Sequence, residues 1–571
     1  MNFSVGGYAD ITGCHPYSDE LSEVHINVNQ RRNVLGSNPA VEQRLGCRAV
    51  LIAHDLGTTG NKASLHDDNG QLVAAVTEPY VTTYGRGGMV EQNPLDWWRA
   101  VCVATRKLLA ASNVAPEHIR GISFSGQMMG VVLVDRQGDP VRPAIIWADT
   151  RSGSQCQRLL DSIGAQDGYR VLGHRLNPTY SLSKLMWVKD NEPDVFQRAR
   201  RLCLAKDFVV SNLTGVVVTD PSDASSTNAF DQRTGRWSDE LISAADLPRD
   251  LFPEIAPATT VVGRVTDRAA EETGLAVGTP VVLGGGDGPM AAVGAGVIDE
   301  SDGAYVYLGS SSWVSVSANA PMHDLPYMRT MTFNHVVPGQ FVPTATMQAG
   351  GGSLAWIADL LSGTEEPDRF DRLVRSAHSV DASAEDLFFL PHLLGERSPY
   401  WNPRAKAAFV GLSRHHGPAH LTRAVLEGVA FNLATCIDAF RSNGVSIDSL
   451  DAIGGGAASD VWLQILADVW GCVVRRRTVV EEANSLGAAV TAGVGVGAFS
   501  DFTVARSLSD VSAVFNPDQD RHEAYRVQHQ RFCDAYNRLE PWFDHSVVEP
   551  PQHEAQPPTA PTTDGSLAGM P

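Results

Sequence analysis

The sequence is short of basic residues and has no long hydrophobic run. Its 45 lysines and arginines face 65 aspartates and glutamates, a formal net charge of −20, which argues against a nucleic-acid partner because such a partner requires a basic surface. The longest apolar stretch, residues 486–499, is rich in glycine and alanine and shorter than the roughly 18–20 residues of a transmembrane helix. The N-terminal residues lack a cationic segment followed by an apolar one, so a signal peptide is not expected. These absences predict a cytoplasmic protein without nucleic-acid or membrane partners.

Cysteine is sparse, and several common catalytic motifs are missing. The eight cysteines show no C-x-x-C pair and no zinc-like spacing, which predicts reduced thiols. The sequence contains no G-x-S-x-G elbow, no G-x-G-x-x-G fingerprint and no Walker A loop, which argues against a hydrolase, a Rossmann dehydrogenase and a P-loop enzyme. His415, His416 and His420 suggest a metal site, but no carboxylate or cysteine set completes it, and a polar loop before a helix is the preferred interpretation.

The composition that is present is globular, with 571 residues, 43% hydrophobic side chains and 52 glycines. A chain of this length is expected to form two large domains or several smaller ones. Residues 1–46 are polar and aperiodic, and residues 546–571 are rich in proline, threonine and alanine. Both segments are therefore expected to be disordered, the first as an extension and the second as a tail.

Two local patterns occur twice along the chain. A strand, a turn of glycine and hydroxyl residues, and a second strand are predicted at 50–66 and again at 304–316. A strand, a triple glycine and a helix are predicted at 281–296 and again from residue 452. This repetition predicts an α/β fold with a duplicated domain and a cleft between the copies, with the boundary at the polar turn near 297–303.

Asp287 is the first candidate catalytic residue. It follows a predicted buried strand, has three glycines before it and one after it, and precedes a predicted helix with Pro289 in its first turn. The glycines allow a sharp turn and close approach of a substrate. A single carboxylate in this setting suits a general base acting on a hydroxyl, and the local alternative is a structural turn with Asp287 as the helix N-cap.

The turn at residues 55–62 has the groups that a phosphate site requires. Backbone N–H groups and the Thr58 and Thr59 hydroxyls can donate to phosphate oxygens, and Asp55 can hold Mg²⁺ through water. A plain β-hairpin would use the same residues. The second hydroxyl-rich turn, at 309–312, favours a triphosphate between two facing turns, and the glycines at 454–456 leave room for adenine or ribose.

The chain from Ala49 to about Arg538 resembles the FGGY family of carbohydrate kinases, most closely its xylulose-kinase branch. The resemblance implies the ribonuclease-H-like fold of actin and hexokinase in two domains, 47–298 for the sugar and 304–545 for the nucleotide, with ATP in the cleft between them. The matching stretches run in order along the chain: 55–62, 88–98, 125–130, 146–151, 181–187, 284–296, 348–356, 394–399 and 454–462.

The resemblance also implies roles for individual residues. Asp287 is similar to the family's catalytic base and lies at its sugar site, and Asp55 resembles the catalytic carboxylate that organises Mg²⁺. The remaining matches are Thr58, Thr59 and Ser310 at phosphate positions, Gly352, Gly455, Gly456 and Ala457 at the nucleotide pocket, and Met128, Met129 and Trp147 at the sugar site.

The activity implied is ATP-dependent phosphorylation of a sugar primary hydroxyl, with D-xylulose to D-xylulose 5-phosphate as the leading case. Met129 departs from the family pattern, because the xylulose kinases have a histidine there that can hydrogen-bond a sugar hydroxyl. Kinases for ribulose, L-xylulose, erythritol or glycerol are therefore alternatives. A catalytically silent nucleotide-binding sensor is disfavoured because Asp55 and Asp287 are both present. The expected ligands are the sugar, ATP and Mg²⁺, and a homodimer is one expectation for the assembly.

Overall fold

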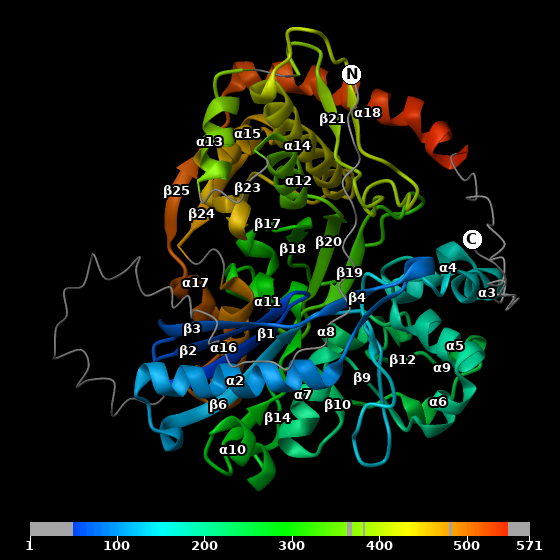
Figure 1. The fold of residues 1–571 in the computed structure, drawn as a ribbon, viewed down its shortest axis with the longest axis vertical. Coiled ribbons are helices and arrows are strands. Elements are labelled where there is room, and N and C mark those ends of the chain that lie inside the picture. The colour runs from blue at the N-terminus through cyan, green and yellow to red at the C-terminus, as the bar shows by residue number, and fades with distance from the viewer. Residues whose placement is uncertain (1–49, 363–367, 381–382, 479–481, 546–571) are drawn as a thin grey trace, which may run out of the picture.

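A computed structural model describes residues 50–362, 368–380, 383–478 and 482–545 of the chain. The segments predicted to be disordered, 1–46 and 546–571, lie outside the described residues. Two α/β halves are stacked along the long axis of the molecule, each built on a seven-stranded mixed sheet (Figure 1). Below, the first half denotes residues 50–298 and the second half residues 304–545.

The sheet of the first half has the strand order β14-β15-β6-β1-β2-β3, with β16 also paired to β6. Strands β1, β2 and β3 form consecutive antiparallel hairpins, and β6 runs parallel to β1. Apolar residues of three helices, α2 (Pro94–Ser112), α7 (Ala205–Thr214) and α10 (Asp267–Thr273), share one core with this sheet. The strand bounds are β1 (Val50–Leu56), β2 (Gly60–His66), β3 (Leu72–Pro79), β6 (Ile119–Gly126), β14 (Val261–Arg264), β15 (Pro280–Val282) and β16 (Gly285–Gly286).

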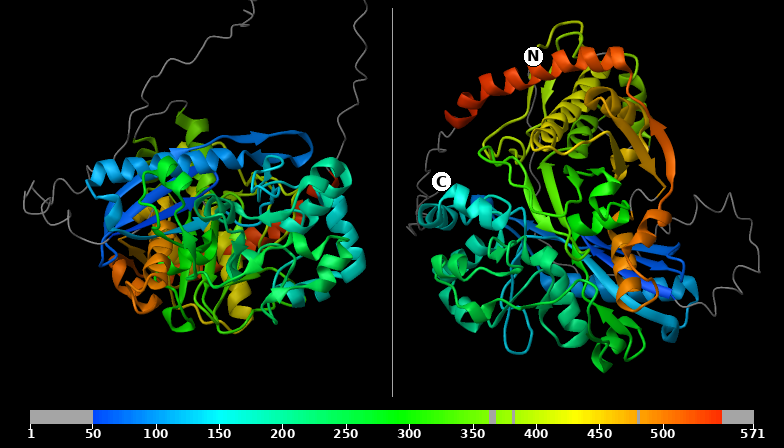
Figure 2. Two further views of the ribbon diagram at one scale, coloured as in Figure 1. Left: turned by 90° about the horizontal axis from the view of Figure 1, so that it is seen from below. Right: turned by 180° about the vertical axis from the view of Figure 1, so that it is seen from behind.

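The sheet of the second half has the order β19-β20-β18-β17-β23-β24-β25. Its core is shared with helices α12 (Gly351–Ser362), α13 (Arg369–Ala377), α14 (Pro418–Ser442), α15 (Asp460–Trp470) and α18 (Gln519–His545). The long helix α18, drawn in red, runs along the outer side of this half (Figure 2). The strand bounds are β17 (Ala304–Leu308), β18 (Ser312–Val316), β19 (Met331–Asn334), β20 (Phe341–Met347), β23 (Ser449–Ile453), β24 (Val473–Arg477) and β25 (Val511–Phe515).

A mainly helical region with its own apolar core extends the first half. It contains α3 (Gly153–Ile163), α4 (Ala165–Leu172), α5 (Ser181–Asn191), α6 (Pro193–Arg198), α8 (Pro221–Ala224) and α9 (Asp239–Ala244). Short paired strands link it to the sheet or close its loops: β4 (Thr82–Tyr84), β5 (Val90–Gln92), β7 (Val132–Val134), β8 (Ala144–Ile145), β9 (Arg201–Cys203), β10 (Val218–Thr219), β11 (Phe230–Asp231), β12 (Arg236–Trp237) and β13 (Glu254–Ile255). The second half has one such pair, β21 (Phe388–Leu390) with β22 (Ala408–Val410).

The duplication is real, but its internal equivalence differs from the predicted one. The pairing of residues 281–296 with those after 452 is wrong, because β23 lies beside the hairpin strand β17, as β6 lies beside β1. The counterpart of β23 is therefore β6, and the counterpart of β15 is β24. Each triple glycine begins with a glycine in the left-handed conformation that packs against the end of a neighbouring strand. The two triple glycines looked equivalent in the sequence because they share this local structure, although they follow strands that are not equivalent. Gly284 contacts the Phe124 backbone of β6, and Gly454 contacts the Leu308 backbone of β17.

Two helices cross between the halves and bring their sites together. Helix α11 (Asp287–Gly294) follows the first sheet, and α16 (Ala483–Gly495) comes from the second half yet packs against β1 and β6 of the first. A Cβ on Gly294 would lie 1.9 Å from the Ala483 carbonyl oxygen, and one on Gly487 would lie 2.1 Å from that of Met290. The glycine- and alanine-rich composition near residue 486 is thus explained by close helix packing.

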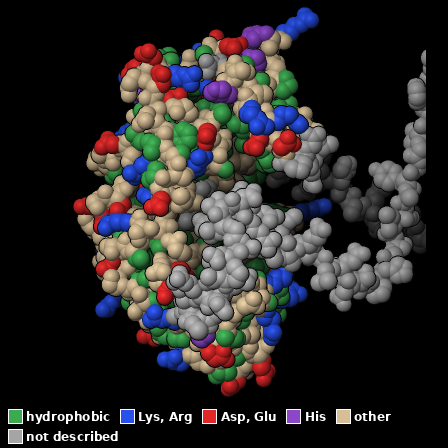
Figure 3. Space-filling model, turned by 90° about the vertical axis from the view of Figure 1, so that its left-hand side faces the viewer, with side chains coloured by type: hydrophobic (Ala, Val, Ile, Leu, Met, Phe, Trp, Pro, Cys, Tyr) green, Lys and Arg blue, Asp and Glu red, His purple; other side chains and the backbone are tan. Residues whose placement is uncertain are grey.

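The described surface and thiols agree with the composition. On the face shown in Figure 3, acidic and basic side chains are interspersed. None of the helices in the described ranges is long and apolar enough to cross a bilayer. Within the same ranges six cysteines are free, five of them buried, as the prediction of reduced thiols requires.

Candidate active site

Asp287 is the first residue of α11, directly after the β16 glycines. Its Oδ1 accepts a hydrogen bond of 2.8 Å from the Gly288 N–H, and the N-cap position belongs to Gly286, so the alternative that made Asp287 the N-cap is wrong. The Gly286 N–H donates to Ser222 Oγ at 2.9 Å. A Cβ on Gly286 would lie 2.7 Å from Met128 Cγ, so only glycine allows this methionine to lie against the turn.

The surroundings of Asp287 change its acidity. Burial raises the pKa of Asp287 from 3.8 to about 7, and the negative charge of nearby Asp55 adds to this, while the Gly288 N–H and the Arg397 cation oppose it. Two carboxylates that feel each other's charge must lie close together. A carboxylate with a pKa near the working pH can take a proton and release it again, as a general base must.

Asp55 lies near the end of β1, where the sequence predicted a carboxylate beside a phosphate-binding turn. Its Oδ1 accepts hydrogen bonds from Ser125 Oγ at 2.7 Å and from Asn484 Nδ2 at 3.3 Å. Burial raises the pKa of Asp55, and these two donors together with the charge of Lys62 oppose that rise. The residue is therefore held by one strand of its own half and by the first turn of α16 from the other half.

The oxygen atoms around Asp55 fit a magnesium ion. Asn484 Oδ1 is buried and has no hydrogen-bond partner among the described residues, while its Nδ2 is used by Asp55. Together with the carboxylates of Asp55 and Asp287 it forms a set of hard oxygen donors, which Mg²⁺ prefers. Asn484 was missed by the sequence analysis because nothing in a local pattern places α16 against the first sheet.

Thr58 and Thr59 form the turn between β1 and β2, and Thr58 also touches the predicted sugar site. Trp147 Nε1 donates to Thr58 Oγ1 at 2.9 Å, and Gln92 Nε2 donates to the Thr58 carbonyl at 2.6 Å. Because the Thr58 hydroxyl oxygen accepts from the indole, its own proton stays free to be donated to a further acceptor. Thr59 is exposed at the tip of the turn.

The residues predicted for the nucleotide lie together at one end of the second sheet. The Gly352 N–H donates to the Ser310 carbonyl at 3.0 Å, which joins the turn after β17 to the start of α12. Gly455, Gly456 and Ala457 follow β23, the parallel neighbour of β17. A Cβ on Gly456 would lie 2.8 Å from Leu308 Cβ, whereas a Cβ on Gly455 would have no atom within 4 Å. Gly455 therefore borders open space.

The three residues predicted for the sugar also lie together. Met128 and Met129 are buried in one apolar cluster, against which the partly buried Trp147 packs. The cluster contains Tyr180 and two side chains of β19, Met331 and Phe333, which the sequence analysis did not single out. Met129 has a φ of 64°, a strained value for a non-glycine residue, so the structure around it must hold it in place.

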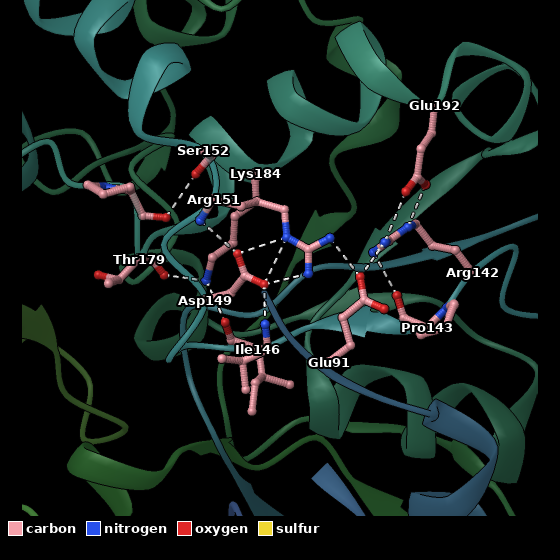
Figure 4. Close-up of polar contacts among 12 residues, drawn as sticks. Glu91, Arg142, Pro143, Ile146, Asp149, Arg151, Ser152, Thr179, Lys184 and Glu192 are labelled. Carbon is pink, nitrogen blue, oxygen red and sulfur yellow. Dashed lines mark hydrogen bonds and ion pairs between the residues drawn. The ribbon is translucent and has the colours of Figure 1, made fainter. Parts of the chain in front are cut away.

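Lys184 of α5 supplies much of that support. Its buried Nζ donates to the Met129 carbonyl at 3.0 Å. It also donates to the Ile146 carbonyl at 2.8 Å and to the Thr179 carbonyl (Figure 4). The Ile146 carbonyl belongs to the peptide that precedes Trp147. One ammonium group thus ties together the two backbone segments that carry Met129 and Trp147.

Ion pairs extend this support outwards (Figure 4). Arg151 pairs with the fully buried Asp149 at 2.6 Å and with Glu91 at 2.8 Å, and Arg142 pairs with Glu91 at 2.6 Å. A cavity of about 750 Å³ lies against Arg151, Arg142 and Glu91. Neither Asp55, Asp287 nor Trp147 lines it, so this cavity lies on the outer side of the network and apart from the carboxylates.

Arg397 reaches the same region from the second half and was also missed as a site residue. Its guanidinium lies over the Trp147 ring, 5.2 Å from the centroid, and its charge acts on Asp287. The only signal in the sequence was its place within the matching stretch 394–399, which gives no role to any one side chain.

The histidine group lies elsewhere, and part of its interpretation is corrected. Glu385, far away in the sequence, faces it: His415 Nε2 lies 3.1 Å from Glu385 Oε2 and His420 Nε2 lies 3.5 Å from Oε1. A carboxylate is thus present, and Glu385, His415 and His416 could geometrically hold an ion. The backbone N–H groups of Ser413 and Gly417, however, donate to Nδ1 of His416 and His420, which leaves the proton on Nε2 and disfavours ligation there.

Comparison with known proteins agrees with this geometry. Residues 50–294 match the model of the N-terminal domain of the FGGY family of carbohydrate kinases, and residues 304–496 match that of its C-terminal domain. The xylulose kinase of Escherichia coli (strain K12) is 34% identical over 86% of this chain and 99% of its own. A ligand-bound xylulose kinase and a gluconate kinase, both from Lactobacillus acidophilus, superpose with TM-scores of 0.81 and 0.80, each at 26% identity and over 87% of this chain and 99% of theirs.

Proposed function

The chain belongs to the FGGY family of carbohydrate kinases, and we propose that this ATP-dependent enzyme phosphorylates a primary hydroxyl of a ketose, with D-xylulose as its first candidate. The observation that carries the proposal is the surroundings of Asp287 at the start of α11: the preceding Gly286 lies against Met128 of the predicted sugar cluster, and the charge of Asp55, which is held by Asn484 of α16, acts on Asp287. The two mixed sheets have the actin-like arrangement of the family's solved structures, as the sequence predicted.

In this proposal Asp287 accepts the proton of the attacking hydroxyl, which adds to the γ-phosphorus of ATP while ADP leaves on the opposite side. Its pKa of about 7 leaves a useful fraction ionised at neutral pH. In this proposal the hydroxyl groups of Thr58 and Ser310 would donate to phosphate oxygens. Positioning of this kind supplies most of the rate in phosphoryl transfer, because the transition state has little covalent demand on the protein.

Asp55 and the Asn484 carbonyl oxygen would hold Mg²⁺ in this proposal. When bound, the ion neutralises charge on the phosphate oxygens. Asp55 is kept in position for this task by Ser125 from β6 and by Asn484 from α16, so both halves must be in place.

The acceptor is the least determined part. D-xylulose is favoured by the 34% identity to a xylulose kinase over nearly the whole length, and gluconate is the second candidate because a gluconate kinase superposes almost as well. Ribulose, L-xylulose, erythritol and glycerol remain alternatives from the sequence. Met129 offers only a weak sulfur acceptor where the xylulose kinases offer an imidazole.

The test is a coupled assay of ATP consumption with each of these acceptors, run beside Asp287→Asn as a blank. We expect magnesium-dependent ADP formation with D-xylulose and a product phosphorylated at a primary carbon. Turnover with none of the acceptors, with the chain folded and able to bind ATP, would instead support the silent sensor. A cytoplasmic location and a homodimer are further predictions from the sequence.

A further inference from the structure

Arg397 carries two buried hydrogen-bond donors that nothing among the described residues satisfies. Its Nε and Nη2 atoms are both inaccessible and without a partner. A buried donor without an acceptor is unfavourable, and guanidinium groups in protein interiors are usually paired with a carboxylate. The two atoms therefore need an explanation.

The neighbouring carboxylate, Glu396, is fully occupied by other groups. Its Oε1 accepts from the backbone N–H groups of Gln348 and Arg397, each at 2.9 Å. Its Oε2 accepts from Asn432 Nδ2 at 3.0 Å and lies 3.1 Å from His392 Nδ1. Glu396 thus anchors the backbone of this loop and the approach to α12, and it leaves the guanidinium of Arg397 unpaired.

The surroundings of the guanidinium belong to the predicted sugar site. Its Cζ lies over the Trp147 ring, and the ionisable groups nearest to it in charge effect are Tyr180, Glu396 and Asp287. Tyr180 and Trp147 are both part of the cluster around Met128. The contact with the Trp147 ring holds the guanidinium group of Arg397 in one orientation before any ligand binds.

The two unpaired donors lie on the same edge of the guanidinium, because Nε–H and the outer Nη2–H point in one direction. Such an edge binds two neighbouring oxygens at once. We propose that Arg397 binds the acceptor substrate through this edge, donating from Nε and Nη2 to two adjacent oxygens of the sugar. This inference rests on the proposed function and deepens it: Arg397 becomes a substrate-binding residue contributed by the second half to a site otherwise built by the first.

Two kinds of acceptor offer an adjacent oxygen pair. In a ketose the pair is two vicinal oxygens, and in a sugar acid it is the carboxylate. Lysine can satisfy a carboxylate as a point charge but cannot supply the parallel donors of the fork. Arg397→Lys therefore separates the two cases: it should keep part of the affinity for gluconate and lose nearly all of the Arg397 contribution for D-xylulose.

The experiment measures binding of D-xylulose and of gluconate by calorimetry without nucleotide, using wild type, Arg397→Lys and Arg397→Met. Arg404→Lys, at an exposed ion pair with Asp544, is the matched control. For the acceptor that wild type prefers, Arg397→Met should weaken binding about 10- to 100-fold while leaving ADP affinity unchanged. A single-deoxy analogue that lacks one oxygen of the pair should bind wild type more weakly, and Arg397→Met should weaken its binding by a smaller factor than that of the intact acceptor.

Stability distinguishes this role from a structural one. Because the donors are unsatisfied in the free protein, Arg397→Met should unfold at the same temperature as wild type or higher. Unchanged acceptor affinity in both variants, or a loss confined to nucleotide binding, would overturn the proposal; the latter would make Arg397 a phosphate contact. If wild type binds an acceptor but never phosphorylates it, the proposed function fails while the binding role of Arg397 is still decided.

Discussion

The two halves use one strand arrangement to build two different sites. In the first half, the parallel pair β1–β6 places Leu56 opposite Gly126. In the second half, the pair β17–β23 places Tyr307 opposite Ile453, and the next residues along the two segments are Leu308 and Gly454. Leu308 and Gly454 therefore correspond to Leu56 and Gly126. Counting on from these glycines, Gln127, Met128 and Met129 hold the places that Gly455, Gly456 and Ala457 hold in the other half. The predicted sugar residues and the predicted nucleotide residues are therefore equivalent positions.

The difference lies in side-chain volume and in charge. Glutamine and two buried methionines fill these places in the first half, whereas the second half has two glycines and an alanine there, and Gly455 borders open space. The position of the Asp55 carboxylate is held in the second half by Tyr307, whose ring stacks on Trp313 with a centroid distance of 4.1 Å. The position of Ser125, which donates a hydrogen bond to Asp55, is held by Ile453. Similarly, α11 has the carboxylate of Asp287 at its first residue, and α16 has the amide of Asn484 at its second. The scaffold is shared, and a few side chains decide which half carries the acid–base chemistry.

We expect the largest effect from Asp287→Asn, which replaces the carboxylate at the start of α11 with an amide, the group that Asn484 supplies in α16. Removing a general base should lower kcat by about 10²–10⁴-fold, with little change in ATP binding. Steady-state kinetics and nucleotide calorimetry measure both quantities. Near-normal turnover would exclude Asp287 as the base.

Asp55→Asn removes the charge that has no counterpart in the second half. If Asp55 holds Mg²⁺, kcat/KM for MgATP should fall about 10- to 100-fold and the magnesium concentration for half-maximal rate should rise. Sugar binding should stay nearly unchanged. The exposed Asp460→Asn serves as the control, and lost sugar affinity with normal nucleotide use would contradict the assignment.

The volume difference can be tested within one triple glycine. Gly455→Ala adds a methyl group into open space, so the fold should be unaffected while KM for ATP rises about tenfold, because the nucleotide meets the new group. Gly456→Ala is the matched variant: its Cβ would press on Leu308 and should destabilise the protein by about 1–3 kcal/mol. Normal ATP use by Gly455→Ala would place the nucleotide elsewhere.

A buried histidine lies in the first sheet where the second sheet has a valine. Two residues before Leu56, His54 occupies the place of Val306. Burial lowers the pKa of His54 to about 4, against a hydrogen bond with the Asn61 side chain that raises it. The unfolded chain, with a histidine pKa of about 6.5, binds the proton more tightly, so stability is complete above that pH and is lost as the pH falls towards 4.

The loss expected from His54 between pH 7.5 and 5.5 is on the order of 1 kcal/mol. Urea unfolding of wild type and His54→Gln at both pH values measures it, because only the difference between the two pH dependences belongs to this residue. Other buried histidines affect both proteins equally. Identical pH dependences would show that folding does not lower the pKa of His54.

The smallest expected effect concerns Met129, the counterpart of Ala457. A histidine there could hydrogen-bond a sugar hydroxyl, worth about 0.5–1.5 kcal/mol, so Met129→His should raise kcat/KM for D-xylulose a few-fold to tenfold relative to the best other acceptor. Met129→Leu, which keeps an apolar side chain of similar size, should not. An unchanged preference in Met129→His would mean that Met129 only packs within its cluster.

Local patterns were sufficient wherever neighbouring residues decide the structure. The β1–β2 hairpin, its turn at Thr58 and the helix after the glycines at 454–456 follow from alternation and turn chemistry, and the structure contains all three. The predicted site residues carry a recognisable pattern because glycines and hydroxyls are needed at fixed places in a turn.

By itself, therefore, the sequence determined the α/β class, the duplication, the family and most of the candidate site. Only the tertiary structure decided which strands are equivalent, because strand order depends on contacts between distant segments. It also decided that α16 crosses to the first sheet and brings Asn484 to Asp55, and that Glu396 is fully used elsewhere and leaves Arg397 unpaired. A hydrogen-bond partner far away in the chain leaves no local pattern, since any polar residue at the right place in space can supply it.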